Sequence, residues 1–329
     1  MGNTEIIAAT SRIQKYENHP NVIAAVESNR DFDMCQIKYD GWWAKVVVSE
    51  GVGNIYSRQG VLKDSFPAEG LKDMVMIAEF LKGTNRAVSS SSSSDKEGQL
   101  MVFDILEHDG EATVGYCYGD RLNILVSLHA EGKLPDMCQV AITNDASYGE
   151  TLWQDGVLTG GGEGLVFRRS TDDYATAIIG RVKRTFTLDY VVMAYNEGGG
   201  KRVGMAGNLV VGLRREELTS SECKELRDKY FAKNPNARGW KEVGRSKLVP
   251  LLLVGGGFND GEMTDQFDNF HDYLMMVIEV KGWQIFKTGC LRHPNAVRGD
   301  DGVIKWRHDK SPVECIWSEA VYHDTLNAY

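Results

Sequence analysis

Four residues, Lys38-Tyr39-Asp40-Gly41, set a lysine beside an acid and a glycine, between two apolar runs. The ordinary pKa of a lysine amine is about 10.4, so the amine is mostly protonated at neutral pH and is a poor nucleophile. Burial or neighbouring cations favour the neutral amine, which is able to attack phosphorus. An apolar strand-turn-strand setting would supply that burial, although the four residues alone favour an ordinary charged turn.

The elements that would position these residues follow from β-branched and aromatic density, glycine turns and helical periodicity. Met34 to Tyr56 is typical of a strand pair broken near residues 50–54. A helix is predicted over Asp120–Gly132, and a leading helix over Glu5–Tyr16. The polar serine run Ser89–Ser94 indicates a surface loop. Further strands are predicted at Met74–Leu81, Gln99–Leu106, Gly164–Arg168 and Ala177–Lys183.

Six clusters follow in an order that resembles the covalent nucleotidyltransferase superfamily of ATP-dependent DNA ligases, RNA ligases and mRNA capping enzymes. Beyond Lys38-Tyr39-Asp40-Gly41 they are Ser57-Arg58-Gln59-Gly60, Ala78-Glu79-Phe80, Val102-Phe103-Asp104, Glu163 to Arg168 and Arg181-Val182-Lys183. Each cluster is a weak signal by itself, since an aromatic is by default a core residue and a charged strand face is usually solvated. Their joint order carries the resemblance.

The resemblance implies that Lys38 attacks the α-phosphorus of ATP and holds AMP through a phosphoramide. It implies catalytic roles for Asp40, Arg181 and Lys183, the last two alternating with Val182 on one strand face. Glu163, with Asp40, would hold Mg²⁺ or Mn²⁺ through oxygen. The implied nucleotide site comprises Gln36, Ile37, Arg58, Glu79, Phe103, Glu163, Arg181, Lys183, Arg307 and Lys310.

Two positions depart from the superfamily pattern. Trp43 stands where an arginine usually follows the first motif, and Arg181 stands where lysine is frequent. Lys45, on the same predicted strand face as Trp43, is a candidate to replace the missing guanidinium. Arg181 keeps the charge but changes its geometry.

The second half points to a DNA ligase within this superfamily. Gly257-Phe258-Asn259-Asp260, Leu291-Arg292-His293-Pro294 and Arg307-His308-Asp309-Lys310 resemble barrel-domain signatures of ATP-dependent DNA ligases. The resemblance implies a minimal two-domain enzyme of phage, viral or bacterial type, acting in DNA repair, replication or recombination. Candidate DNA contacts are Arg58, Arg214, Arg215, Arg292 and Arg298, and the polar insertion near 214–245 is a candidate DNA-clasping loop.

The expected fold class is α+β: a nucleotidyltransferase domain with antiparallel sheets over residues 1–187, then an OB-fold β-barrel over 188–329. The barrel is favoured by short strands separated by glycine-rich turns after Lys183. With 329 residues, 42% hydrophobic and 25% charged, the composition is that of a globular protein of about two domains.

Composition also bounds location and partners. No apolar run approaches the roughly 20 residues of a membrane span, and the N-terminus lacks a signal pattern. The cysteines are scattered without zinc-ligand spacing and read as reduced thiols. We therefore expect an intracellular protein, and the resemblance implies a monomer in the cytoplasm or at the nucleoid of a bacterial host. Because the net charge is -9, any surface for nicked duplex DNA must be a local basic stripe.

Two alternatives remain open from the sequence. An RNA ligase or capping guanylyltransferase would use the same lysine chemistry on RNA. A non-catalytic protein that binds nicks or single strands would form no covalent nucleotide at Lys38, and Trp43 is the feature that favours it.

Overall fold

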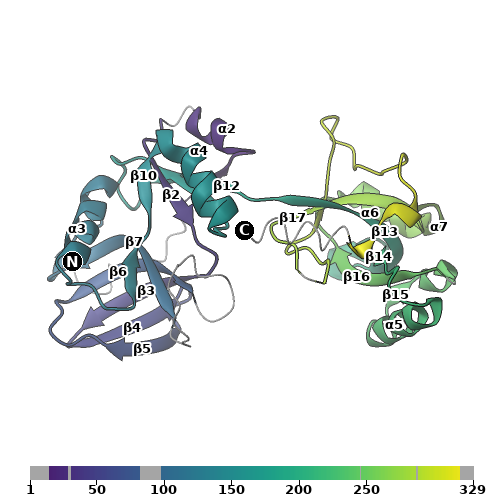
Figure 1. Cartoon of the computed structure of the whole chain (residues 1–329), viewed down its shortest axis with the longest axis horizontal. Helices are drawn as coiled ribbons and strands as arrows, with labels where there is room; N and C mark the ends of the chain where they lie inside the picture. Colours follow the sequence, from purple (N-terminus) through teal and green to yellow (C-terminus); the bar gives the residue numbers. More distant parts are fainter. Residues whose placement is uncertain (1–14, 29–30, 82–97, 245, 287, 319–329) are drawn as a thin grey trace. The chain divides into compact units, whose positions relative to one another are not determined.

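The computed structural model describes residues 15–28, 31–81, 98–244, 246–286 and 288–318. Most of the predicted leading helix and the serine run Ser89–Ser94 lie outside these residues. Lys15 and Tyr16, which were predicted to end that helix, belong instead to strand β1 (Lys15–Asn18). The chain divides into two compact units, the first ending at Lys183 and the second beginning at Arg184. Residues 184–187, predicted to close the first domain, thus fall in the second unit (Figure 1).

The first unit contains two sheets. The smaller sheet has the strand order β1-β12-β11-β2-β10. Its pairs are antiparallel apart from β1 with β12, which is parallel. The bounds of its other strands are β2 (Met34–Lys38), β10 (Thr143–Asp145), β11 (Gly164–Arg168) and β12 (Ile178–Lys183).

The larger sheet runs in the order β5-β4-β3-β6-β7-β8, and β9 pairs with β7 in parallel. Its strands are β3 (Trp42–Ser49), β4 (Val52–Ser57), β5 (Leu62–Pro67), β6 (Met74–Leu81), β7 (Gln99–His108), β8 (Glu111–Ala112) and β9 (Cys138–Val140). The predicted antiparallel character is therefore confirmed for most strand pairs, with two parallel exceptions.

Short helices accompany these sheets, and the helix α3 (Tyr118–Ala130) packs on β7 and β9. It ends two residues before Gly132, which has a φ of 65° and so takes the left-handed conformation that glycine tolerates. The predicted helix at this place is confirmed. The remaining helical segments of this unit are α2 (Val22–Val26), η1 (Ala146–Tyr148), α4 (Gly149–Leu152) and η2 (Trp153–Thr159).

The second unit is built on a sheet with the order β16-β14-β13-β17-β18, and the short β15 pairs with β13. Residue Gly256, just after β16, forms a parallel bridge to Asn295 in β18, and Ala296 N donates to Gly256 O at 2.9 Å. This bridge joins the two ends of the sheet, so the sheet curls toward a barrel. The strands are β13 (Phe186–Glu197), β14 (Ala206–Arg214), β15 (Ala237–Arg238), β16 (Leu248–Val254), β17 (Val277–Gly282) and β18 (Asn295–Ala296).

The polar insertion near 214–245 contains the helix α5 (Ser220–Lys233), which begins with a capping box between Thr219 and Glu222. The guanidinium of Arg227 is buried and donates to the carbonyl oxygens of Gly244, at 2.8 Å, and Leu248, at 2.7 Å. These bonds fasten the helix to β16, so this segment is a packed part of the unit. The other helical segments are η3 (Gly200–Arg202), η4 (Trp240–Val243), α6 (Asp260–Asp268), α7 (Phe270–Tyr273) and η5 (Pro312–Glu314).

Candidate active site

Three neighbouring strands bring two lysines to one carboxylate. In the smaller sheet, Lys38 of β2 lies opposite Gly164 of β11, which in turn lies opposite Lys183 of β12. Glu163, one residue before β11, receives the ammonium of Lys38 on Oε2 and that of Lys183 on Oε1, the latter at 2.6 Å. Gly164, which lies between the two lysines, has no side chain, and a Cβ there would lie 2.0 Å from the carbonyl oxygen of Val182.

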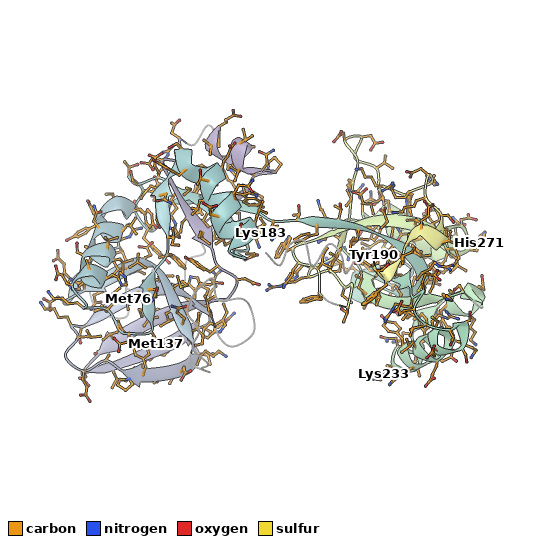
Figure 2. The ribbon with its side chains drawn as sticks, in the orientation of Figure 1. Met76, Met137, Lys183, Tyr190, Lys233 and His271 are labelled. Carbon is orange, nitrogen blue, oxygen red and sulfur yellow. The ribbon has the colours of Figure 1, made fainter. Side chains whose placement is uncertain are left out.

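The electrostatics of this cluster follow from partial burial. The side chains of Lys38, Glu163 and Lys183 are 21%, 11% and 13% exposed. Burial pushes the pKa of Glu163 upward, but the charge of Lys38 and hydrogen bonds from both lysines hold that pKa below its ordinary value. Burial lowers the pKa of Lys183, against the opposing effect of Glu163. Glu163 is therefore an anion shared by two amines, one of them from Lys183, the last residue of β12, which Figure 2 labels.

Glu79 lies beside the turn that follows Lys38. Its Oε1 accepts from the backbone N–H of Gly41 at 3.0 Å. Burial raises the pKa of Glu79, while the nearby charge of Lys38 lowers it and that of Asp40 raises it. Gly41 is required here by close approach, because a Cβ would lie 2.5 Å from the carbonyl oxygen of Phe80. The structure thus brings together five of the candidate site residues, Lys38, Asp40, Glu79, Glu163 and Lys183.

Arg181 shares a strand with Lys183 but contacts another partner. Its Nε donates to Asn18 Oδ1, and its guanidinium lies over the ring of Tyr16 at 5.0 Å. Both partners come from β1, the strand that pairs in parallel with β12. These contacts of Arg181 thus lie with β1, whereas Lys183 contacts Glu163.

The larger sheet positions Arg58 and Lys45. The guanidinium of Arg58, a predicted site residue, lies 5.2 Å from the ring centroid of Trp43. Trp43, which departs from the superfamily pattern, therefore contacts a predicted site residue. Lys45 is 7% exposed, and its Nζ lies 5.4 Å from the centroid of Tyr56. Burial lowers the pKa of Lys45.

Gln36 and Ile37 face opposite sides of β2. Ile37 is buried in a core cluster with Val157 and Leu165. Its side chain therefore does not share the face of Lys38, although the sequence placed it in the nucleotide site. Gln36 does share that face, because side chains alternate along a strand.

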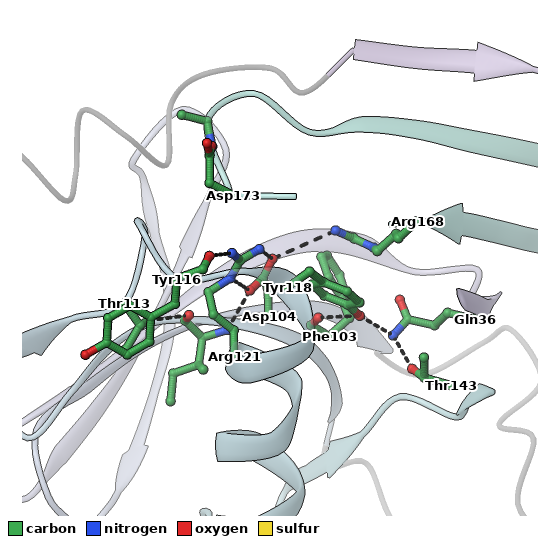
Figure 3. Close-up of polar contacts among 12 residues, drawn as sticks. Gln36, Phe103, Asp104, Thr113, Tyr116, Tyr118, Arg121, Thr143, Arg168 and Asp173 are labelled. Carbon is green, nitrogen blue, oxygen red and sulfur yellow. Dashed lines mark hydrogen bonds and ion pairs between the residues drawn. The ribbon is translucent and has the colours of Figure 1, made fainter. Parts of the chain in front are cut away.

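A buried polar network lies next to Gln36 and Phe103, and the sequence analysis missed it. Arg121 of α3 donates to the carboxylate of Asp104 at 2.7 and 3.1 Å, with both side chains fully buried. Arg168 Nη1 lies 3.8 Å from the same carboxylate, and its guanidinium stacks over Tyr118 at 4.7 Å (Figure 3). Asp104 and Arg168 belong to the motif clusters quoted above, and Arg121 lies in the predicted helix. The signal available in the sequence was a charged residue within an apolar pattern at each of these positions.

In the second unit the predicted cations have local acidic partners. Arg298 binds Glu262 through two hydrogen bonds, of 3.0 and 2.6 Å. Arg214 and Arg215 pair with Glu216 and Glu217.

The last motif is also paired within its own unit. Arg307 Nη1 and Lys310 Nζ both donate to Asp189 Oδ2, each at 3.0 Å. Arg307 also binds the carboxylate of Asp309. This contact lowers the pKa of Asp309 to about 2, although desolvation acts in the opposite direction. Arg292 N donates to Gln284 O at 2.8 Å.

Among the described residues, no three His, Cys, Asp or Glu side chains form a group that could bind a metal by themselves. No helix of the described residues is long and apolar enough to cross a membrane.

Comparison with known proteins relates the chain to DNA ligases, although no family model matches it. A probable DNA ligase of Saccharopolyspora erythraea is 34% identical over 165 residues, covering 46% of this chain and 31% of that protein. A DNA ligase of Natronomonas pharaonis is 26% identical over 217 residues, covering 59% of this chain and 38% of that protein. The chain thus spans only about a third of the length of these curated relatives.

Solved structures agree with the fold. A structure of the Lig E DNA ligases, described as minimal scaffolds for DNA binding, superimposes with a TM-score of 0.58 at 18% identity, covering 87% of this chain and 99% of the other. A chain named Pmar-Lig_PreS3 gives a TM-score of 0.58 at 16% identity, covering 86% and 66%. Over part of its length this chain is thus similar in sequence to DNA ligases, and its α+β fold is similar to that of a solved DNA ligase structure.

Proposed function

We propose that the protein is an ATP-dependent DNA ligase that seals nicks between a 5′-phosphate and a 3′-hydroxyl in duplex DNA. The observation that carries this proposal is the placement of Lys38 and Lys183 on the two oxygens of Glu163. A lysine nucleophile with a second cation beside it suits attack at a phosphorus where negative charge develops.

The reaction would run in three steps. Lys38 loses a proton, its Nζ bonds to the α-phosphorus of ATP, and pyrophosphate leaves. The AMP then passes to the 5′-phosphate of the nick, which frees the lysine. The 3′-hydroxyl next attacks that 5′-phosphate, so a phosphodiester bond forms and AMP leaves. Lys183 is placed to stabilise the negative charge at the α-phosphorus.

The site fits Mg²⁺ or Mn²⁺ that enters with nucleotide phosphates, since Mg²⁺ usually takes one or two carboxylates together with substrate phosphates and waters. Glu163, and Asp40 from the neighbouring turn, are the residues that would hold it. The ion would neutralise phosphate charge when bound. Glu163 would have to exchange one of its lysine contacts for the ion.

The second unit would act as the OB-fold domain that grips DNA, with the adenylation domain preceding it. The strand order and the parallel bridge from Gly256 to Asn295 support such a barrel. Arg307 and Lys310 would assist the first step, while Arg58, Arg214, Arg215, Arg292 and Arg298 would contact DNA. The pairing of Arg298 with Glu262 means that this residue would have to exchange its acid for a phosphate.

The insertion helix α5 would contact DNA through its exposed lysines. Deleting it would remove the packing of Arg227 on β16, so charge substitution is the sharper test. Lys229→Ala with Lys233→Ala should weaken nick binding, because both lysines are exposed on α5. The same nick affinity as wild type would exclude the helix as a DNA contact.

The activity is tested by sealing of a nicked DNA duplex with ATP and magnesium, beside matched substrates in which one strand is RNA. Sealing of the DNA nick, lost in Lys38→Ala, is the expected result. Preference for RNA ends, or covalent transfer from GTP, would favour the RNA ligase or capping alternative. Binding without any sealing or covalent nucleotide would favour the non-catalytic alternative. We also propose that the protein works as an intracellular monomer.

A further inference from the structure

The hydrogen bonds of Gln36 determine which way its amide points. Gln36 Nε2 donates to Thr143 Oγ1 at 2.7 Å and to Tyr118 Oη at 3.3 Å. Thr143 lies directly opposite Gln36 in the pairing of β10 with β2, so both side chains share one face. Gln36 itself is 3% exposed, so its amide is held within protein.

Each of these hydroxyl groups is already a donor to a backbone carbonyl. Thr143 Oγ1 donates to Ala141 O at 3.0 Å, and Tyr118 Oη donates to Phe103 O at 3.2 Å. A hydroxyl has one hydrogen to donate, so toward Gln36 each oxygen must act as acceptor. The group of Gln36 that faces them is therefore its NH₂, and both of its hydrogens are used.

The carbonyl oxygen of Gln36 is left as the acceptor. No donor within the described residues bonds to this Oε1. Gln36 and Lys38 are two residues apart on one strand and so lie on the same face, about 7 Å apart along it. A nucleotide whose α-phosphorus meets Lys38 therefore has its base within the reach of the Gln36 face.

Tyr118 is itself held rigidly. Its ring is stacked by the guanidinium of Arg168 at 4.7 Å, and Arg168 lies beside the Asp104–Arg121 pair (Figure 3). Burial raises the pKa of Tyr118, and the nearby Arg168 opposes this, so the phenol remains a proton donor at neutral pH. The hydroxyl also ties Gln36 to the backbone of Phe103, another residue of the implied nucleotide site.

We propose that Tyr118 and Thr143 are positioning residues that make Gln36 an acceptor, and thereby select adenine over guanine. The inference rests on the proposed function. Adenine carries a 6-amino group, which donates to Oε1, whereas guanine and hypoxanthine carry a 6-oxo group, which would meet a second acceptor. An amide released by loss of either hydroxyl is free to turn its NH₂ toward a 6-oxo group.

The test is single-turnover formation of the covalent protein–nucleotide with ATP and with inosine triphosphate, which has the 6-oxo group but lacks the 2-amino group of guanine. Tyr118→Phe should raise the ratio of the inosine to the adenosine rate by about tenfold, the equivalent of one hydrogen bond. Thr143→Val should move the ratio in the same direction. Tyr116→Phe is the matched control, since the Tyr116 hydroxyl bonds Glu111 outside this network, and it should leave the ratio unchanged.

A merely structural role would lower both rates together and leave their ratio as in wild type. Circular dichroism checks that each variant folds, and Thr143→Val tests the same amide if Tyr118→Phe does not. An unchanged ratio in a folded variant of either residue overturns the inference while leaving the proposed function intact. The absence of covalent nucleotide from wild-type protein with every triphosphate would instead overturn the proposed function, and the inference with it.

Discussion

The two units of the chain handle charge in different ways. In the first unit, buried or half-buried charges converge: Lys38 and Lys183 share Glu163, and Arg121 and Arg168 share Asp104. In the second unit, arginines of the predicted DNA surface are partly exposed and pair with acids close by, as Arg298 does with Glu262.

The difference is between buried charges, which need their partners for the fold to be stable, and partly exposed charges, which can exchange their partners for a binding molecule. A buried charge that loses its partner is left in a medium of low polarity, which is strongly unfavourable. A partly exposed pair exchanges its partner for water or phosphate at little loss. The first unit is thus organised around fixed geometry, and the second around contacts that a polyanion can replace.

The largest effect is expected at the buried pair. Asp104→Asn keeps the shape but leaves Arg121 without its counter-charge, and should lower the free energy of unfolding by about 3–5 kcal/mol. Urea denaturation measures this. Asp109→Asn, in an exposed pair with Lys72, is the same substitution in the same unit and should leave the midpoint unchanged. Equal losses in both variants would show that burial does not set the difference.

Catalysis should respond strongly to Lys183. Lys183→Met removes the second cation on Glu163 and should slow formation of the covalent nucleotide by about 10²–10³-fold, the usual effect of losing one group that stabilises a charged transition state. Rapid-quench measurement with labelled ATP gives the rate. Lys72→Met, at an exposed pair, serves as control. A Lys183→Met rate within a factor of two of wild type would remove Lys183 from the chemistry.

The variant Lys45→Ala tests whether Lys45 takes the place of the arginine that the superfamily usually has where Trp43 stands. We expect Lys45→Ala to slow nick sealing by about tenfold, because one phosphate contact is lost. The salt dependence of nick binding should fall by about one unit of slope. Sealing at the wild-type rate would reject this role for Lys45.

The smallest effect is expected in the second unit. Glu262→Gln removes the charge that pairs with Arg298 but keeps a side chain able to complete the capping box with Asn259. The free energy of unfolding should change by about 1 kcal/mol or less, because the pair is partly exposed. If Arg298 serves DNA, its release should also tighten nick binding. A destabilisation as large as that of Asp104→Asn would erase the contrast between the units.

Much of the first unit could be predicted from the sequence because its signals are local. The runs Met74–Leu81 and Gly164–Arg168 coincide with β6 and β11 as predicted. The alternation of apolar and polar residues along a short strand is encoded within a few residues, so a strand can be predicted without knowing which strands pair with it.

The partners of charged residues were less predictable because they lie far apart in the sequence. The Lys38–Glu163 contact spans 125 positions, and motif order assigned both residues to one site, whereas nothing local tied Arg121 to Asp104 or Tyr118 to Gln36. Arg181 shares β12 with Lys183, but the parallel pairing with β1 gives it Asn18 as a partner, which no local pattern predicted. Such long-range pairing is decided by which strands become neighbours.

Peptide mapping by mass spectrometry shows whether Lys38 carries the nucleotide. Purified protein is incubated with ATP and magnesium, digested, and searched for peptides that carry one AMP, before and after addition of a nicked duplex. If Lys38 carries the nucleotide, AMP is found on the peptide that contains Lys38, in an acid-labile phosphoramide, and is lost as the nick is sealed. AMP on another residue such as Lys183, or none on any peptide, would contradict this role of Lys38.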